Sequence, residues 1–337
     1  MNLQSKMTSV DVIVPCYRYG HFLRECVQSV LNQAGPDVRV LIIDDASPDN
    51  TAEVAADLVQ SDSRVSFRRH RINKGHIATY NEGIDWASAD YMLLLSADDY
   101  LLPGALRRAA DLMDAHPEVG FTFGKGFELH ENGTITDVTA IEPAFNQTGW
   151  RIIRGLEFIE FSGSKNIVCT PTAVVRTELQ KLLGGYRFEL PHAGDMEMWL
   201  RFAAHASVGI FDSCQAVYRR HSSNMSLAYM AHGWLPDVQQ RKAALECFFE
   251  MCAGTLPDTL RLRHKMFRSV AGVSIGFAST AFNDGEMVLS EQLSDFALGV
   301  CPDIRRSLPW IKLACKRHLG FRAWQILSAL YRRTDAR

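Results

Sequence analysis

The sequence of 337 residues lacks the features that mark several classes of protein. Its net charge is only −2, which argues against general nucleic-acid binding. It contains no run of about 18 consecutive apolar residues, so we expect no transmembrane helix. The polar segment from Met1 to Ser9 is followed by only a short apolar run, so we also expect no signal peptide.

Paired cysteines and repeats are also absent from the sequence. None of the eight cysteines stands in a Cys-x-x-Cys pair, and no internal repeat or low-complexity tract occurs. Most of the cysteines lie in apolar runs, which indicates reduced core residues and a cytoplasmic protein. The length indicates one main domain with an extension.

Two adjacent carboxylates, Asp98 and Asp99, follow the most apolar run of the chain, Met92–Leu95. Such a run is typical of a strand that is buried on both faces in a parallel sheet. Like charges at its end repel each other and lose hydration, and a divalent cation is the usual partner that offsets this cost. The alternative is a solvated turn in which Asp99 and Pro103 begin the next helix.

Strand-like and helix-like segments alternate through the first third of the chain. The strand-like segments are 9–15, 38–43, 65–67 and 92–95, and helical spacing occurs at 21–33, 52–60 and 77–87. This alternation predicts an α/β fold with a doubly wound, mainly parallel sheet. The carboxyl ends of parallel strands meet at one edge, so we expect the polar residues that follow three of these strands to converge on one crevice. They are Pro15 with Tyr17, Asp44 with Asp45, and Asp98 with Asp99.

An ordered set of motifs resembles the inverting family 2 glycosyltransferases, which have the GT-A fold with a Rossmann-like nucleotide-binding half. In the first half the segments are Val12–Tyr17, Ile43–Asp49, Asn73–Gly83 and Leu95–Asp99. In the second half they are Thr172–Arg176, Gly184–Tyr186, Gly194–Arg201 and Tyr218–Ser226. The resemblance extends over about residues 9–226 in the family's order and spacing, and the ordered set is far more specific than any one motif.

The resemblance implies that the first half binds a nucleoside diphosphate sugar, with a UDP-sugar as the favoured donor. Pro15 and Tyr17 would line the nucleotide pocket, and Tyr17 would lie beside the base. Asp44 would accept a hydrogen bond from the base or ribose, whereas Asp45 would share that role or simply hold the loop. The segment Asn73–Gly75 resembles the loop that closes over the nucleotide; the alternative is a simple turn.

The resemblance also implies a metal site for Mn²⁺ or Mg²⁺. Asp98 stands at the metal-binding position of the family's Asp-x-Asp motif, and Asp99 would help to hold the metal or the donor sugar. Ser96 replaces the first acidic residue of that motif, which is a departure from the family pattern. His221 stands where a histidine often completes the metal site or contacts the diphosphate, although a lone histidine is more often structural. The metal would stabilise charge on the leaving nucleoside diphosphate.

Asp195 is the expected general base. The family motif usually reads Glu-Asp, two residues, then Leu-Trp; here Gly194 replaces the Glu, and Asp195 keeps the spacing of four to Trp199. If Asp195 begins a helix, Glu197 lies about 200° further round the helix axis and cannot act as the general base in its place. The alternative is that Asp195 is only the N-cap of a packed helix.

The last third of the chain has mostly helical patterns. We expect a GT-A domain at 1–230, made of a nucleotide-sugar half at about 9–125 and an acceptor half at about 126–230, followed by a helical extension at 231–337. The expected activity is metal-dependent, inverting transfer of a sugar to a hydroxyl of a glycan or lipid-linked glycan. The alternatives are a non-catalytic nucleotide- or glycan-binding module and a sugar nucleotidyltransferase. The latter is disfavoured because Cys16–Gly20 is not a glycine-rich loop.

Residues 305–337 contain nine Lys or Arg and one acidic residue, Asp335, with aromatic and aliphatic residues between them. A basic amphipathic helix of this kind can lie on an anionic membrane surface, which would suit a lipid-linked acceptor and a peripheral position on the inner face of the cell membrane. The alternative is a helix that packs on the catalytic domain or on a second subunit, as in a homodimer.

Overall fold

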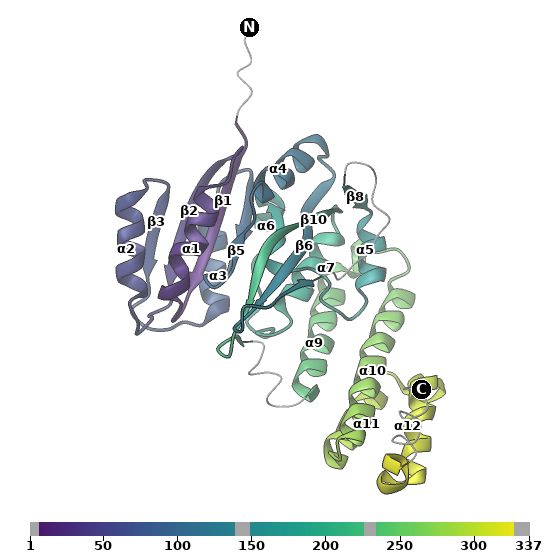
Figure 1. Ribbon diagram of the computed structural model, residues 1–337. Helices are drawn as coiled ribbons and strands as arrows, with labels where there is room; N and C mark the ends of the chain where they lie inside the picture. Colours follow the sequence, from purple (N-terminus) through teal and green to yellow (C-terminus); the bar gives the residue numbers. More distant parts are fainter. Residues whose placement is uncertain (1–6, 139–148, 226–233, 327–337) are drawn as a thin grey trace. The chain divides into compact units, whose positions relative to one another are not determined.

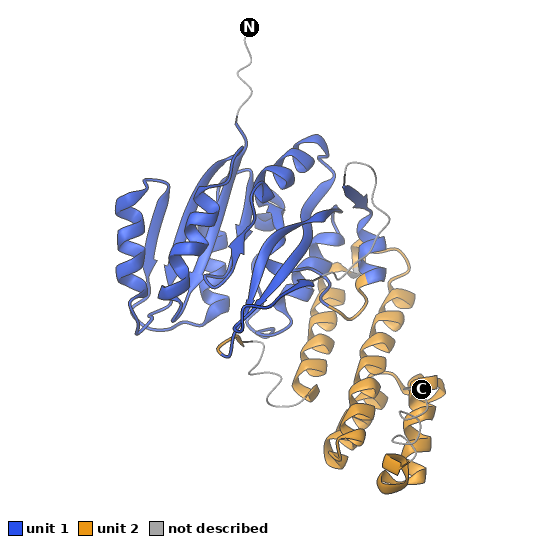
Figure 2. Cartoon of the chain, in the orientation of Figure 1, with its two compact units in different colours: residues 1–161, 166–222 blue, residues 162–165, 223–337 orange. Residues whose placement is uncertain are grey.

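The computed structural model describes residues 7–138, 149–225 and 234–326. Contacts divide the chain into two compact units (Figure 2). The first consists of Met1–Phe161 and Asn166–Ser222, and the second of Ser162–Lys165 and Ser223–Arg337.

The first unit begins with four parallel strands in the order β3-β2-β1-β4 (Figure 1). These are β1 (Ser9–Cys16), β2 (Asp37–Asp44), β3 (Val65–Arg69) and β4 (Tyr91–Leu94). The helices between them are α1 (Gly20–Leu31), α2 (Thr51–Ser61) and α3 (His76–Trp86). The apolar residues of β1 and β2 are almost fully buried, because helices cover the sheet on both faces. The alternation predicted from the sequence is therefore confirmed.

The sheet continues through strands of both directions. Its further strands are β5 (Tyr100–Leu101), β6 (Val119–His130), β7 (Ile135–Val138), β8 (Trp150–Ile153), β9 (Val174–Arg176) and β10 (Ser207–Arg220). The short β9 runs antiparallel between β4 and β6, and β10 runs parallel to β6. The helical segments of this part are α4 (Ala105–Ala115), α5 (Gly155–Ser162), α6 (Thr177–Leu183), α7 (Gly194–Ala203) and the 3-10 turn η1 (Thr170–Thr172).

Helix α3 packs very closely against strand β1. A Cβ atom added at Gly83 would lie 2.3 Å from Cγ2 of Ile13, so only glycine allows this approach. The N-terminus of α3 therefore has a fixed position near the carboxyl end of β1, where the expected site lies.

The second unit is a helical bundle. Its helices are α9 (Trp234–Cys252), α10 (Thr259–Asn283), α11 (Met287–Val300) and α12 (Leu308–Leu319), with 3-10 turns η2 (Ala253–Thr255) and η3 (Pro302–Arg306). The long α10 packs against the other three helices, and residues such as Ile275, Leu293 and Leu313 form the shared core. The expected helical extension is thus present. Among the described residues, no helix is both long and apolar enough to cross a membrane.

Candidate active site

The adjacent carboxylates after β4 are buried, so the alternative of a solvated turn is wrong. The N–H of Asp99 donates to the carbonyl of Ser96 over 3.0 Å and closes the turn. Oδ1 of Asp99 accepts a hydrogen bond of 3.0 Å from the N–H of Arg219, which ties the turn to the end of β10. Burial and the neighbouring charge of Asp98 raise the pKa of Asp99 well above its ordinary value. Asp99 therefore fixes the turn that presents Asp98.

His221 lies beside Asp98, as the resemblance implied. Its Nε2 is 3.1 Å from Oδ2 of Asp98. The imidazole packs against two rings from the segment after β1, with centroid distances of 5.3 Å to Tyr19 and 5.4 Å to Phe22. The ends of β1, β4 and β10 thus bring one carboxylate and one imidazole nitrogen to the same point.

This pair has the chemistry that a divalent cation needs. One carboxylate with a further protein ligand suits Mg²⁺ or Mn²⁺, which commonly take their remaining ligands from substrate phosphates and water. Within the described ranges, no cluster of three or more His, Cys, Asp or Glu residues could hold a metal ion. A cation bound by Asp98 and His221 would therefore depend on oxygens supplied by a substrate.

The side chain of Asp44 is fully buried at the end of β2. Oδ1 accepts a hydrogen bond of 2.8 Å from the N–H of Ser47. Nε of Arg69 lies 3.1 Å from Oδ2, but Oδ2 accepts no hydrogen bond from any described residue. Asp44 therefore retains a buried acceptor oxygen, which a ligand N–H or O–H could use.

Pro15 lies near the end of β1, and Tyr17 lies in the loop that follows it. The Tyr17 side chain is 40% exposed, and the guanidinium of Arg18 lies 5.3 Å from its ring centroid. The N–H of Arg18 donates to Oγ of Ser47 over 2.9 Å, so this loop is fastened to the loop after Asp44. Tyr17 is accordingly an exposed ring beside a loop that is fastened to the turn after Asp44.

Asp45 holds the loop that was expected to close over the nucleotide. Its Oδ1 accepts from the N–H of Lys74 over 2.7 Å, and its Oδ2 accepts from the N–H of Gly75 over 2.9 Å. Nδ1 of His70 also lies 2.7 Å from Oδ1. Within the loop, the N–H of Gly75 donates to Oδ1 of Asn73 over 3.0 Å, and Gly75 has a φ of +84°. Of the two roles considered for Asp45, these contacts show the loop-holding one.

Asp195 lies in the first turn of α7, and both of its carboxylate oxygens accept hydrogen bonds. The hydroxyl of Tyr186 donates to Oδ1 over 2.9 Å, and the hydroxyl of Thr170 donates to Oδ2 over 3.1 Å. The N-cap of α7 is Ala193, so the alternative in which Asp195 is the N-cap is wrong. Burial raises the pKa of Asp195 above its ordinary value, and the two hydrogen bonds oppose that effect.

Glu197, the second acidic residue in the first turn of α7, forms an ion pair with Arg201. Nη2 of Arg201 lies 2.9 Å from Oε2 of Glu197, and both side chains are almost fully buried. Arg201 also donates to the carbonyls of Leu183, Gly184 and Gly185. This buried pair therefore holds the segment that leads into Tyr186.

Several residues that support Asp195 were not predicted from the sequence. The ring of Tyr80 on α3 lies 5.3 Å from the ring of Tyr186 and 5.4 Å from that of His76. The side-chain amide of Asn81 donates to the carbonyl of Tyr186 over 2.9 Å and accepts from its N–H over 2.7 Å. These residues lay within a recognised motif, and the spacing of four between His76 and Tyr80 was the available signal for a shared helix face.

Burial and neighbouring acidic charges affect the pKa of Tyr80. Burial, followed by the charges of Asp195 and Asp98, raises the pKa of Tyr80. The Tyr80 hydroxyl is therefore within electrostatic range of both the expected base and the expected metal ligand. Tyr80 lies on the same helix as Gly75, which is its N-cap, and packs on Tyr186, the partner of Asp195.

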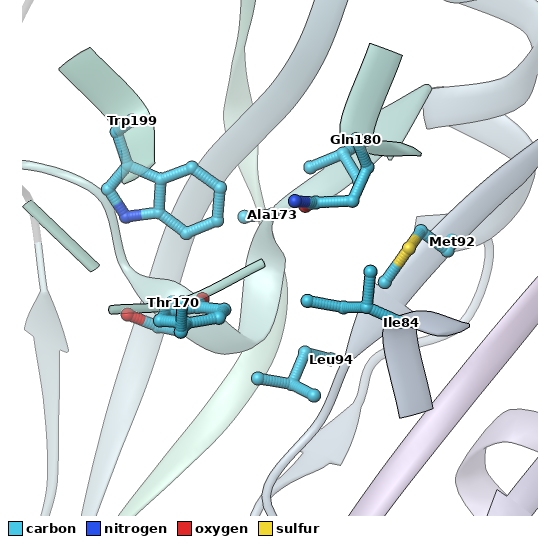
Figure 3. A pocket seen from close by; sticks show the side chains of 9 residues that line it. Ile84, Met92, Leu94, Thr170, Ala173, Gln180 and Trp199 are labelled. Atoms are coloured by element: carbon cyan, nitrogen blue, oxygen red, sulfur yellow. The ribbon is translucent and has the colours of Figure 1, made fainter. Parts of the chain in front are cut away.

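A small cavity is lined in part by Thr170 and Tyr186. Figure 3 shows side chains from several elements, including Ile84, Met92 and Trp199, directed toward the same space. Its volume is about 10 Å³, which is roughly the space for one water molecule and far too little for a sugar. This small, mainly apolar cavity therefore borders the two residues that bond to Asp195 and is not a substrate pocket.

The chain is similar to several known glycosyltransferases. Residues 11–182, just over half of the chain, match the profile of the family described as Glycosyl transferase family 2. A 233-residue segment is 26% identical to the hyaluronan synthase of Pasteurella multocida, covering 66% of this chain and 22% of that protein. A 101-residue segment is 34% identical to the GalNAc(5)-diNAcBac-PP-undecaprenol beta-1,3-glucosyltransferase of Campylobacter jejuni, covering 30% of this chain and 33% of that enzyme. The chain therefore spans a third or less of the length of these two relatives.

A solved structure shows the same fold. The crystal structure of S. aureus TarS 1-349 in complex with UDP-GlcNAc superposes with a TM-score of 0.58 at 17% identity, covering 89% of this chain and 92% of that chain. At this identity the likeness is one of fold. Together with the family match over more than half of the sequence, it shows that the protein is a family 2 glycosyltransferase with the GT-A fold.

Proposed function

We propose that the protein transfers a sugar from a nucleoside diphosphate sugar to an acceptor hydroxyl in a single inverting displacement. The observation that carries this proposal is helix α3, whose N-cap Gly75 is held by Asp45 and whose Tyr80 packs on Tyr186, the hydrogen-bond donor to Asp195. It gives one site both a donor-side loop and a carboxylate that is held ready to accept a proton.

Asp195 acts as the general base. It takes the proton of the acceptor hydroxyl while that oxygen forms a bond to the anomeric carbon. The bond between the anomeric carbon and the diphosphate oxygen breaks, and its electron pair leaves with the nucleoside diphosphate. Because burial raises the pKa of Asp195, its carboxylate is a better proton acceptor than an exposed one. The hydroxyls of Tyr186 and Thr170 orient the two carboxylate oxygens.

The donor is a UDP-sugar. The buried Oδ2 of Asp44 is suited to accept the ring N–H of uracil, and the exposed ring of Tyr17 would flank the base. The TarS complex with UDP-GlcNAc supports a uridine nucleotide on this fold. Pro15 would line the same pocket, and the loop from Asn73 to Gly75 would cover the nucleotide.

Asp98 and His221 would hold a Mn²⁺ or Mg²⁺ ion when the donor is bound. Such an ion supplies positive charge for the diphosphate and so lowers the energy of its departure. Asp99 contributes by fixing the turn, through its hydrogen bond from Arg219.

The acceptor is a hydroxyl of a glycan or a lipid-linked glycan, and the enzyme works in the cytoplasm. The named activity of the Campylobacter relative, which concerns an undecaprenol-linked saccharide, supports a lipid-linked acceptor. All eight cysteines are free thiols, which suits a reducing compartment.

Calorimetric titration with UDP, GDP, dTDP and CDP, each with and without Mn²⁺, tests the donor site. We expect UDP to bind tightest and to require the metal for full affinity. Absence of binding to every nucleotide would overturn the proposal, and binding that is unaffected by metal would remove the metal role from Asp98 and His221.

The Asp195→Asn variant tests the base. It should lose at least about a hundredfold in transfer rate, since general base catalysis contributes about 10²–10⁴, while its nucleotide affinity stays unchanged. Full transfer by this variant would refute the assignment of Asp195. Nucleotide binding by the native protein without transfer to any glycan acceptor would favour a non-catalytic binding module.

A further inference from the structure

Helix α12 packs on the second unit with one face. Leu313 is buried in the core of the bundle, and Arg317 donates to Oγ of Ser290 over 2.8 Å and to Oγ of Ser294 over 2.9 Å. Lys316 donates to Oγ of Ser279 over 2.7 Å. These contacts define the inward face of the helix and fix its rotation; the packing is on the helices of the second unit, which neither alternative from the sequence named.

The opposite face of α12 carries an exposed apolar stripe. Leu308 is 73% exposed, Ile311 is 47% exposed and Leu319 is 49% exposed, and Cys315 between them is also exposed. At 3.6 residues per turn these positions fall within about 80° of one another around the helix axis. An apolar stripe directed to solvent on a helix that is already packed through its other face indicates a second contact surface.

Cations predominate beside this stripe, and Asp303 in η3 is an exposed acidic residue next to them in the sequence. Arg305, Arg306, Lys312 and Arg322 are exposed, and no Asp or Glu occurs in the sequence from Ile304 to Ile326. A positive field of this kind complements an anionic surface. If a second copy of the chain bound through the same face by twofold symmetry, it would bring like charges together, so that occupant is disfavoured.

We propose that the stripe of Leu308, Ile311, Cys315 and Leu319 lies in the headgroup region of an anionic lipid bilayer, with Arg305, Arg306, Lys312 and Arg322 on the lipid phosphates. A helix with an apolar stripe and cationic edges binds in the plane of such an interface. This attachment goes beyond the transfer activity and does not depend on it.

The test is flotation of the full chain with vesicles of phosphatidylcholine alone and with vesicles of phosphatidylcholine and phosphatidylglycerol. The native protein should float with the anionic vesicles only, and higher salt should weaken binding because it screens the charges. Each neutralised cation should lower the partition coefficient by about fivefold, so that Arg305→Gln with Arg306→Gln lowers it by about 25-fold.

The Ile311→Glu variant tests the stripe itself, and Leu260→Glu on α10 is its matched control. Leu260 is 83% exposed and lies outside the stripe, so the same substitution there should leave flotation unchanged. Equal flotation of Ile311→Glu and native protein, or no flotation of the native protein at low salt, would overturn the proposal. Equilibrium sedimentation tests whether a second copy of the chain covers the stripe instead. A dimer of the native protein that is lost in Ile311→Glu would assign the stripe to a second copy and overturn the proposal. Circular dichroism of each variant checks that the bundle is folded.

Discussion

The hydroxyl of Tyr186 donates a 2.9 Å hydrogen bond to Oδ1 of Asp195. The backbone N–H and C=O of the same tyrosine both form hydrogen bonds with the side-chain amide of Asn81. The proposed base is therefore positioned by helix α3, which belongs to the donor half of the site. Because neither Tyr186 nor Asp195 is a proposed metal ligand, this contact can be tested separately from the metal site.

The Tyr186→Phe variant should shift the acidic limb of the pH–rate profile to higher pH. The lost hydrogen bond favoured the charged carboxylate, so the pKa of Asp195 rises and the base stays protonated over a wider acidic range. Other groups facing this carboxylate, namely His76, His192 and Tyr80, are retained in the variant. At neutral pH we expect a loss in kcat of about 10- to 100-fold, since a hydrogen bond to a charged group is worth about 1.5–3 kcal/mol. A lower kcat with an unshifted profile would mean that Tyr186 has only a structural role.

The His221→Ala variant should weaken the effect of Mn²⁺ on UDP binding. The variant lacks one of the two proposed protein ligands of the ion. We therefore expect its affinity for the metal to fall by about 10- to 100-fold, by analogy with weakened metal sites. Calorimetry of metal-free UDP binding is the internal control and should be unchanged. If the metal dependence survives in full, the ion is held without His221.

The His70→Ala variant should loosen the donor loop. The buried His70 lies 2.7 Å from Asp45 and 2.9 Å from Glu82 through its two ring nitrogens, and Asp45 in turn holds Lys74 and Gly75. We expect about a tenfold weaker UDP affinity, because the loop must be ordered at binding, with a smaller change in kcat.

The Arg68→Ala variant is a suitable control for His70→Ala. Arg68 is an exposed partner of the same Glu82, at 3.5 Å, and contacts of that kind contribute little. Protease cleavage within the segment 71–75 should increase in His70→Ala and not in Arg68→Ala. Equal UDP affinity in native protein and His70→Ala would contradict the loop-holding role of Asp45 and His70.

The Arg201→Met variant should destabilise the protein by about 3–5 kcal/mol, since it leaves Glu197 buried without its partner. Burial already raises the pKa of Glu197, and removing the cation raises it further. The folded state then binds a proton more tightly than the unfolded state, so the variant should regain stability as the pH falls. Urea unfolding across pH measures this, and the double variant Glu197→Gln with Arg201→Met should lose less than Arg201→Met. Stability that falls in parallel with the native protein at every pH would contradict the pairing.

The sequence predicted the parallel half of the fold closely because buried strands and amphipathic helices there follow regular periods. It did not predict the antiparallel β9, which has only three residues and takes its direction from tertiary pairing with β4 and β6. Periodicity carries little information over so short a segment.

For the site, the sequence identified residues by type but not by their contacts. Asp98 and His221 were expected together, and the structure brings them to 3.1 Å. The contacts of His70, Tyr80 and Tyr186 were not foreseen, because they join separate segments: Asn81 and Tyr186, for example, are 105 positions apart. Such pairings depend on how α3 lies against the segment before α7, which no local pattern specifies.

The close approach of Gly83 to Ile13 has a consequence for the geometry of the proposed reaction. An inverting displacement requires the leaving group and the base on opposite sides of one carbon. The donor loop ends where α3 begins, and Tyr80, which packs on the tyrosine that holds Asp195, lies on the same helix. One helix, held against β1 at Gly83, therefore positions both the end of the donor loop and the tyrosine that packs on the partner of the proposed base.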